Sequence, residues 1–204
     1  QVGAAELAHV IAQFFRSQTD QPRRLLGNDD LGVRATVFDN ERLGRAERRQ
    51  EAQFLGPPPI DGGIVIKEIF YAPASKTSPE EVVELFNNGD DIVDLSGWYF
   101  SDGISYAFPA DTTLGPGEYL VVAEAPAVLR SLYGDFRALG PYVGRLENEG
   151  ERIVLRNAQG GIEDEVDYGL GFPWPTTGRP VNHSMELLHP ELDNDLGGSW
   201  RGLA

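Results

Sequence analysis

Three carboxylates alternate along one short stretch of the chain. Glu163, Glu165 and Asp167 occupy every second position, so on a strand their side chains share one face. Like charges crowded on a strand face repel one another unless water, an arginine or a divalent cation relieves them. Oxygen ligands of this type suit calcium. The spacing therefore predicts either a calcium site or a solvated sheet face, and we favour the solvated face.

Four aromatic residues form a second candidate site. Tyr142, Tyr168, Phe172 and Trp174 fall in neighbouring predicted loops and strand ends, and prolines flank Trp174. Rings grouped in this way can form a platform for sugars or for proline-rich peptides. The alternative, which we favour, is a loop that closes one end of the fold.

Two further glutamates stand in apolar surroundings. Glu68 and Glu84 each have apolar residues two positions away on both sides, which predicts that each carboxylate is partly buried. A buried carboxylate requires hydrogen-bond donors or a cation. We therefore expect both to have a structural role, with arginine, indole or backbone groups as partners.

The residue combinations of common enzymes are absent from the sequence. His9, His183 and His189 lack the i, i+4 spacing of zinc enzymes, and cysteine does not occur. Neither the Gly-x-Ser-x-Gly motif of hydrolases nor a phosphate-binding Gly-x-x-x-x-Gly-Lys loop is present. The stretch 193–197 begins like a calcium loop, but Ala204 stands where the closing glutamate belongs. We therefore expect no enzymatic activity.

Charge is distributed unevenly along the chain. The net charge is −15, and residues 61–204 hold 24 acidic against nine basic residues, whereas 1–60 are balanced with eight of each. An acidic surface repels nucleic-acid phosphates and anionic membranes, so we expect neither as a partner. Cations, basic partners or simple solubility are compatible with such a surface, and we favour solubility; as a partner we expect a protein or a cell-surface polymer. No apolar run reaches the roughly 20 residues that cross a bilayer, so we expect no membrane insertion.

The first segment, 1–60, has the pattern of helices. Residues 4–17 place apolar side chains on one helical stripe, and 40–54 predict a second helix with its arginines outward. Two helices with so few large apolar residues make a poor core, so we expect an appendage or the end of a preceding domain. The stretch 56–63 (GPPPIDGG) marks the boundary, because its prolines fix an extended path and its glycines end it.

The second segment, 61–204, changes to the two-residue period of strands. Runs rich in β-branched and aromatic residues alternate with turn signals such as Asn-Gly and Gly-Pro-Gly. A proline near its start and a glycine after its end predict one short helix at 126–133. Short strands at this spacing predict a mainly β fold, an antiparallel two-sheet sandwich. The predicted strands are 64–71, 81–87, 92–101, 106–108, 118–123, 151–156, 161–168 and 184–188.

An ordered set of motifs runs through this segment. Its members are IVIKEI at 64–69, EVVEL at 81–85, DLSGW at 94–98, FPA at 108–110, the strand within 114–122, GERIVL at 150–155, DEVDY at 164–168, PWP at 173–175 and SME at 184–186. Together these motifs resemble a known family, the lamin tail domain in its bacterial form. One departure is visible: Lys67 stands where bacterial members commonly have Asn before the glutamate of the first strand.

The resemblance implies an immunoglobulin-like β-sandwich in which Trp98 is buried in the core beside Leu95. Bacterial members of the family occur in large exported or surface proteins, often beside hydrolase or adhesion-like domains. In animal lamins the module binds proteins and, more weakly, DNA. The acidic charge of this chain argues against DNA binding.

Two functional hypotheses follow. The first is a non-catalytic interaction or scaffold module of an exported or cell-surface bacterial protein. The second is an accessory domain of a larger hydrolase, which presents substrate or docks on the catalytic domain. The chain opens with Gln1 rather than Met and without a leader, so we expect it to be part of a longer polypeptide.

Overall fold

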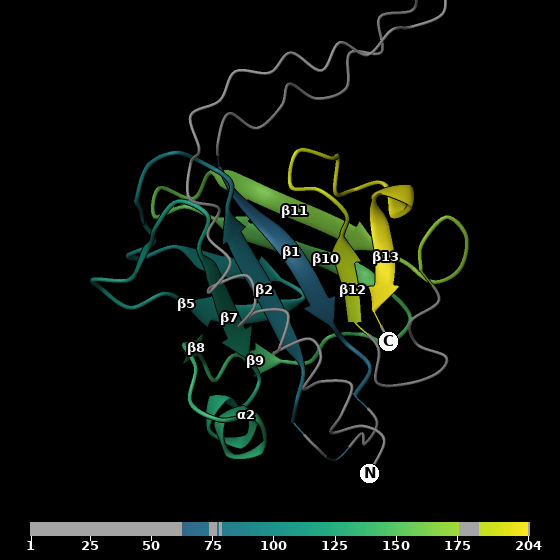
Figure 1. Ribbon diagram of the computed structural model, residues 1–204, viewed down its shortest axis with the longest axis horizontal. Helices are drawn as coiled ribbons and strands as arrows, with labels where there is room; N and C mark the ends of the chain where they lie inside the picture. The colour runs from purple at the N-terminus through teal and green to yellow at the C-terminus, as the bar shows by residue number, and fades with distance from the viewer. Residues whose placement is uncertain (1–62, 74–76, 78, 176–183, 204) are drawn as a thin grey trace, which may run out of the picture.

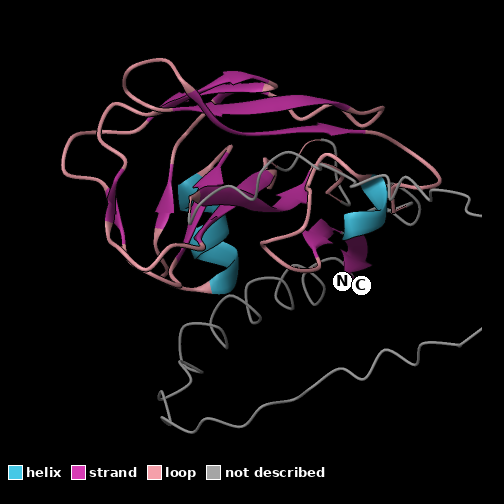
Figure 2. Ribbon diagram, turned by 90° about the horizontal axis from the view of Figure 1, so that it is seen from above, coloured by secondary structure: helices cyan, strands magenta, loops and turns pink. Residues whose placement is uncertain are grey.

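The computed structural model of the 204-residue chain describes residues 63–73, 77, 79–175 and 184–203. These residues form a mainly β fold in which two sheets stack face to face, with a helix against the outside of one sheet (Figure 1, Figure 2). The predicted β-sandwich is therefore confirmed. The helices predicted within 1–60 lie outside the described residues. None of the described helices is long and apolar enough to cross a membrane.

The larger sheet has six strands in the order β13-β12-β1-β2-β7-β8. Neighbouring strands in it are antiparallel, except that β7 and β8 are parallel. The bounds are β1 (Ile64–Phe70), β2 (Val82–Asn87), β7 (Tyr119–Ala123), β8 (Ala138–Leu139), β12 (Ser184–Leu187) and β13 (Trp200–Leu203).

The smaller sheet has five strands in the order β11-β10-β4-β5-β9, and a two-stranded ribbon pairs β3 with β6. A single 3-10 turn, η1 (Gly197–Ser199), precedes β13 among the described residues. The bounds are β3 (Val93–Asp94), β4 (Tyr99–Asp102), β5 (Ile104–Ala107), β6 (Thr113–Leu114), β9 (Val143–Gly144), β10 (Glu151–Arg156) and β11 (Ile162–Tyr168).

Most strands fall within one or two residues of their predicted ranges, but the predicted strand 92–101 is divided into β3 and β4. Asp94 Oδ1 accepts a hydrogen bond from the Ser96 N–H at 2.9 Å, which closes an Asx turn. Gly97 then adopts a φ of 74°, a value that glycine reaches without steric cost. The local turn therefore overrides the strand propensity of the flanking residues.

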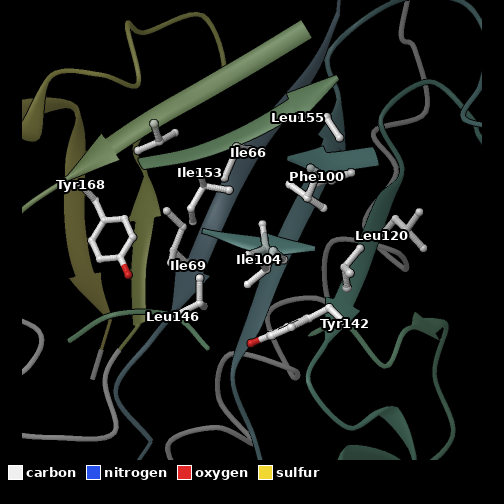
Figure 3. Packing of buried hydrophobic residues seen from close by; sticks show 14 of the residues in the cluster. Ile66, Ile69, Phe100, Ile104, Leu120, Tyr142, Leu146, Ile153, Leu155 and Tyr168 are labelled. Carbon is white, nitrogen blue, oxygen red and sulfur yellow. The ribbon is translucent and has the colours of Figure 1, made fainter. Parts of the chain in front are cut away.

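The core lies between the two sheets (Figure 3). Each large apolar side chain buried in this way contributes roughly 1.5–3 kcal/mol of transfer free energy. Trp98 does not belong to the fully buried set: it is half-buried at the end of the Asx turn, whereas Leu95 is fully buried. The predicted burial of Trp98 is therefore only partial, although its side chain packs against the core. The central members are Ile66, Ile69, Leu85, Phe100, Ile104, Leu120, Ile153 and Leu155.

The helix α2 (Pro126–Tyr133) covers part of the outer face of the six-stranded sheet, on the side away from the five-stranded sheet (Figure 2). Its Leu129 packs against a cluster that includes Phe70 of β1 and Val82 of β2. The helix has the range predicted from its proline and from Gly134, which follows it with a φ of 99°. The outer face of this sheet is therefore partly apolar and covered.

Candidate functional site

A row of three glutamates crosses the outer face of the six-stranded sheet. Glu84 on β2 lies opposite Glu68 on β1, which lies opposite Glu186 on β12. Val83 and Leu85 point into the core, so Glu84 between them points outward. Glu68 is only 4% exposed and Glu84 only 6%, while Glu186 is half-buried. We call Glu84, Glu68 and Glu186 the buried carboxylate row.

A β-bulge brings Lys67 to this row. The pairing of β1 with β2 shifts between Ile66 and Glu68, because a bulge places an extra residue in one strand. Lys67 Nζ donates hydrogen bonds to Glu186 Oε1 at 2.8 Å and to the Leu187 carbonyl. Lys67, which is itself buried, thus supplies a positive charge beside the row.

The positive charges of this region converge on Glu186. Arg201 donates to Glu186 Oε2 from Nε at 3.0 Å and from Nη2 at 2.6 Å, while Lys67 holds the other oxygen. Burial acts to raise the pKa of Glu186, but the hydrogen bonds from Lys67 and Arg201 outweigh it and the pKa is lowered. Glu186 is therefore held in its ionised form by these two partners.

The other two glutamates lie in the opposite electrostatic environment. Burial, followed by the negative charge of Glu186, raises the pKa of Glu68 to about 7, although the neighbouring Ser184 hydroxyl and the positive charges of Lys67 and Arg201 lower it. Burial and then the charge of Glu68 raise the pKa of Glu84 well above its usual range. Glu68 Oε1 is buried and, within the described part of the chain, accepts no hydrogen bond. The predicted burial of both side chains is confirmed, but the expected donor to Glu68 Oε1 is not found.

A fourth buried carboxylate ties the two sheets together. Asp164 Oδ2 accepts hydrogen bonds from the Ile66 N–H at 2.6 Å and from Asn194 Nδ2 at 2.8 Å. Burial is the largest influence on this carboxyl and raises its pKa to about 7. Because these donors belong to β1 and to the loop before β13, Asp164 has a structural role in joining β11 to both.

The predicted acidic strand face lies on β11, on the outside of the five-stranded sheet. Each carboxylate there has its own surroundings: Glu163 accepts from Asn157 Nδ2 at 2.5 Å, Glu165 pairs with Arg152, and Asp167 is exposed. No group of three or more His, Asp or Glu side chains in the described ranges is placed to hold a metal ion. The structure therefore does not bring the three together as a calcium site.

Asp102 on β4 extends this face, since Arg152 Nη1 lies 3.4 Å from Asp102 Oδ2. The side chains of Asp102, Arg152 and Glu165 are all between 41% and 50% exposed. We call Asp102, Glu163, Glu165 and Asp167 the acidic sheet face. It offers carboxylates to solvent at the regular spacing of a sheet.

The four predicted aromatic ligand residues do not form one platform. Tyr142 and Tyr168 are buried in the core (Figure 3), and the Tyr142 hydroxyl lies 3.2 Å from Glu81 Oε2. Trp174 is half-buried against the core, whereas Phe172 is fully exposed. Tyrosines whose hydroxyls have buried partners pack well inside a fold, and the sequence gives no sign of those partners.

Exposed apolar side chains do occur in two loops that lie against each other. The Gly197 Cα lies so close to the Pro173–Trp174 backbone that a Cβ would stand 2.7 Å from Trp174 N. The loop 169–175 is therefore packed against the loop 188–199. The exposed residues of these loops are Leu170, Phe172, Leu188, Leu192 and Leu196.

Sequence reasoning missed the cluster of Lys67, Glu186 and Arg201. A signal was present at Lys67, because a lysine followed by a glutamate inside an otherwise apolar strand cannot place both side chains in solvent. The bulge resolves this conflict by putting both on one face. The partners on β12 and β13 depend on strand order, which the sequence pattern does not specify.

Comparison with known proteins places this fold in a family. The lamin tail domain model matches residues 57–170, which is more than half of the chain. No curated protein matches. Among solved structures, a DUF4876 family protein from Bacteroides thetaiotaomicron VPI-5482 is similar at 14% identity with a TM-score of 0.34, covering 59% of this chain and 46% of that one. The chain thus spans about half the length of that protein. The family match covers the motifs from IVIKEI at 64–69 to DEVDY at 164–168, and it ends before PWP at 173–175 and SME at 184–186. Since it spans more than half of the sequence, the chain belongs to the lamin tail domain family.

Proposed function

We propose that this chain is a non-catalytic interaction module that binds a basic protein partner through the acidic sheet face. The observation that carries the proposal is the exposure of Asp102, Glu165 and Asp167 on the outer surface of a regular sheet. Among the described residues, only Arg152 forms a salt bridge with Asp102 and Glu165. Complementary charge guides the encounter of two proteins and selects the partner.

The surroundings of the buried acids support a non-catalytic role. A catalytic acid or base must reach its substrate and have a pKa suited to proton transfer. Glu81 instead accepts hydrogen bonds from the Leu146 N–H at 2.8 Å and from Tyr142, and Asp164 holds the two sheets together. These carboxyls stabilise the fold from inside it.

We extend the proposal to location. Bacterial lamin tail domains occur in large exported or surface proteins, and the excess of acidic residues in 61–204 suits contact with a basic protein or with a cell-surface polymer. The same charge disfavours nucleic acid as a partner.

A second candidate function is supported by the exposed apolar loops. Leu170, Phe172 and Leu196 stand in loops that pack against each other, and exposed apolar groups often mark a contact surface. Such loops suit docking on a neighbouring domain of the same polypeptide. An accessory domain of a larger hydrolase would use them in this way.

The test of the first proposal is calorimetric titration of the purified chain with a lysine- and arginine-rich peptide. Glu163→Lys with Asp167→Lys should abolish most of the binding. Asp90→Lys with Asp91→Lys makes the same change in net charge at exposed positions and should leave binding largely intact. Equal losses in both variants would show attraction to net charge alone and would contradict the assigned face.

The non-catalytic role has its own test. The purified chain should not turn over model phosphoester, peptide or glycoside substrates. Hydrolysis that a single carboxylate change abolishes would overturn this part of the proposal. Binding to the peptide and the absence of hydrolysis are independent results, so either one can fail alone.

A further inference from the structure

Glu68 and Glu84 lie directly opposite each other on β1 and β2, where binding through the acidic sheet face gives them no role. The two residues are Cα partners on antiparallel strands, and side chains directly opposite one another have Cβ atoms about 4.5–5.5 Å apart. Both are more than nine-tenths buried. Two carboxylates at this separation cannot both be ionised without strong repulsion unless a positive charge lies between them.

The nearby cations are occupied elsewhere. Lys67 Nζ donates to Glu186 Oε1 and to the Leu187 carbonyl, and Arg201 donates twice to Glu186 Oε2. Both contribute favourable charge to Glu68 from a distance. Neither donates a hydrogen bond to Glu68 Oε1, which has no partner in the described residues.

The neighbouring strand on the other side brings a hydroxyl and no cation. Tyr119 on β7 is influenced by all three glutamates: burial first, and then the charges of Glu84, Glu186 and Glu68, raise its pKa to about 12. It therefore stays neutral at physiological pH. The charged and titratable groups that influence the pair are thus Lys67, Glu186, Arg201 and Tyr119.

We propose that Glu68 and Glu84 form a buried proton-binding site, in which one carboxyl group keeps its proton at neutral pH and donates it to the carboxylate of the other. The proton gives the unpartnered Glu68 oxygen a hydrogen-bond partner, and it removes one of two adjacent negative charges. A metal ion is the less suitable occupant, because the described residues hold no group of three ligands for one.

The raised pKa values agree with this geometry, since burial raises that of Glu68 to about 7 and that of Glu84 well above its usual range. Carboxyl groups whose pKa is higher in the folded than in the unfolded chain bind protons more tightly when folded. Their stabilising effect is therefore full below the unfolded pKa of roughly 4.3 and is lost as pH rises through about 7 and beyond. The proposal does not depend on which partner the acidic sheet face binds.

The experiment compares thermal unfolding of the wild type, Glu68→Gln and Glu84→Gln from about pH 5 to about pH 9. Glutamine has the shape of a protonated glutamate and also a hydrogen-bond donor, but it cannot ionise. The melting temperature of both variants should therefore fall less than that of the wild type as pH rises. Glu165→Gln, at an exposed position paired with Arg152, is the matched control and should follow the wild type. Identical pH profiles for the wild type and both pair variants would overturn the proposal.

A second measurement does not require a variant to fold. Wild-type protein with 13C-labelled glutamate side chains should show two carboxyl resonances that still carry or share a proton at neutral pH and titrate above the ordinary range of glutamate. If every glutamate resonance titrates in the ordinary range, no buried proton is held. If calcium at about pH 9 restores the melting temperature of the wild type but not of either variant, the pair binds a metal ion instead of a proton, and the proposal is likewise overturned.

Discussion

The two sheets carry carboxylates on their outer faces under opposite conditions. On the five-stranded sheet, Glu165 and its partner Arg152 are both more than 40% exposed. On the six-stranded sheet, Glu68 and Glu84 face each other with water almost excluded. In the sequence the two sets differ in their neighbours: Glu68 and Glu84 each have apolar residues two positions away, whereas the carboxylates of β11 alternate along one strand. Burial, more than residue type or spacing, decides which set can meet a partner and which one must be neutralised inside the fold.

The largest expected effect comes from removing the buried cation. Lys67→Ala leaves the Leu187 carbonyl and the carboxylate row without it, and loss of one partner from a buried ion pair destabilises by about 4 kcal/mol. Urea unfolding measures the loss. Lys67→Gln keeps a donor without the charge and should lose less. If Lys67→Ala lowers the free energy of unfolding by less than about 1 kcal/mol, Lys67 contributes no more than an exposed salt bridge does, which would contradict this prediction.

The cover on the six-stranded sheet is the next target. Leu129 of α2 is fully buried against the sheet, so Leu129→Ala should lower the free energy of unfolding by about 3 kcal/mol. Leu132, on the same helix, is half exposed. Leu132→Ala should therefore change the free energy of unfolding by less than about 0.5 kcal/mol. Equal effects of the two changes in thermal unfolding would mean that α2 does not cover the face as described.

Within β11, the comparison can be made between two aspartates of the same strand, Asp164 and Asp167. Asp164→Ala leaves the Ile66 N–H and the Asn194 amide without their acceptor, which should cost about 2 kcal/mol. Asp167→Ala, at an exposed position of the same strand, should cost much less. The difference is measured by chemical denaturation of both variants, and its absence would contradict the joining role of Asp164.

The smallest effect is expected at the exposed salt bridge. Arg152→Ala removes the partner of Glu165 and Asp102, but exposed pairs contribute less than about 1 kcal/mol. Salt should reduce even this difference, because it screens exposed charges. Unfolding at low and at high salt tests both statements. A large loss in the free energy of unfolding that persists in high salt would contradict this prediction, because only a pair shielded from solvent, such as Lys67 with Glu186, should behave in that way.

Most of the fold could be predicted from local patterns. The strands 151–156 and 161–168 and the helix 126–133 agree with β10, β11 and α2 because alternation, turn residues and a proline at the helix start act within a few residues. The split of 92–101 was missed, because the Asx turn at Asp94 competes with strand-forming neighbours. β13, at the end of the chain, was missed because Gly202 interrupts a very short run.

The candidate sites were less accessible to sequence reasoning. The exposed carboxylates of β11 could be predicted as a strand face, since only the period of a strand is needed. The burial of Tyr142 and Tyr168 depends on partners such as Glu81 and Glu151, which are distant in sequence. The opposition of Glu68 and Glu84 depends on the register of β1 with β2, which shifts at a bulge at Lys67. The lysine and glutamate side by side in an apolar strand indicate an irregularity there, but they do not specify the register.

The most direct test of the contrast between the two faces is NMR mapping of the lysine- and arginine-rich peptide on the 15N-labelled chain. The account predicts shifts in amide resonances of β4, β10 and β11, around Asp102, Arg152 and Asp167, with little change around Glu68 and Glu84. Shifts centred on β1, β2 and β12, or no shifts at peptide concentrations that bind by calorimetry, would contradict it.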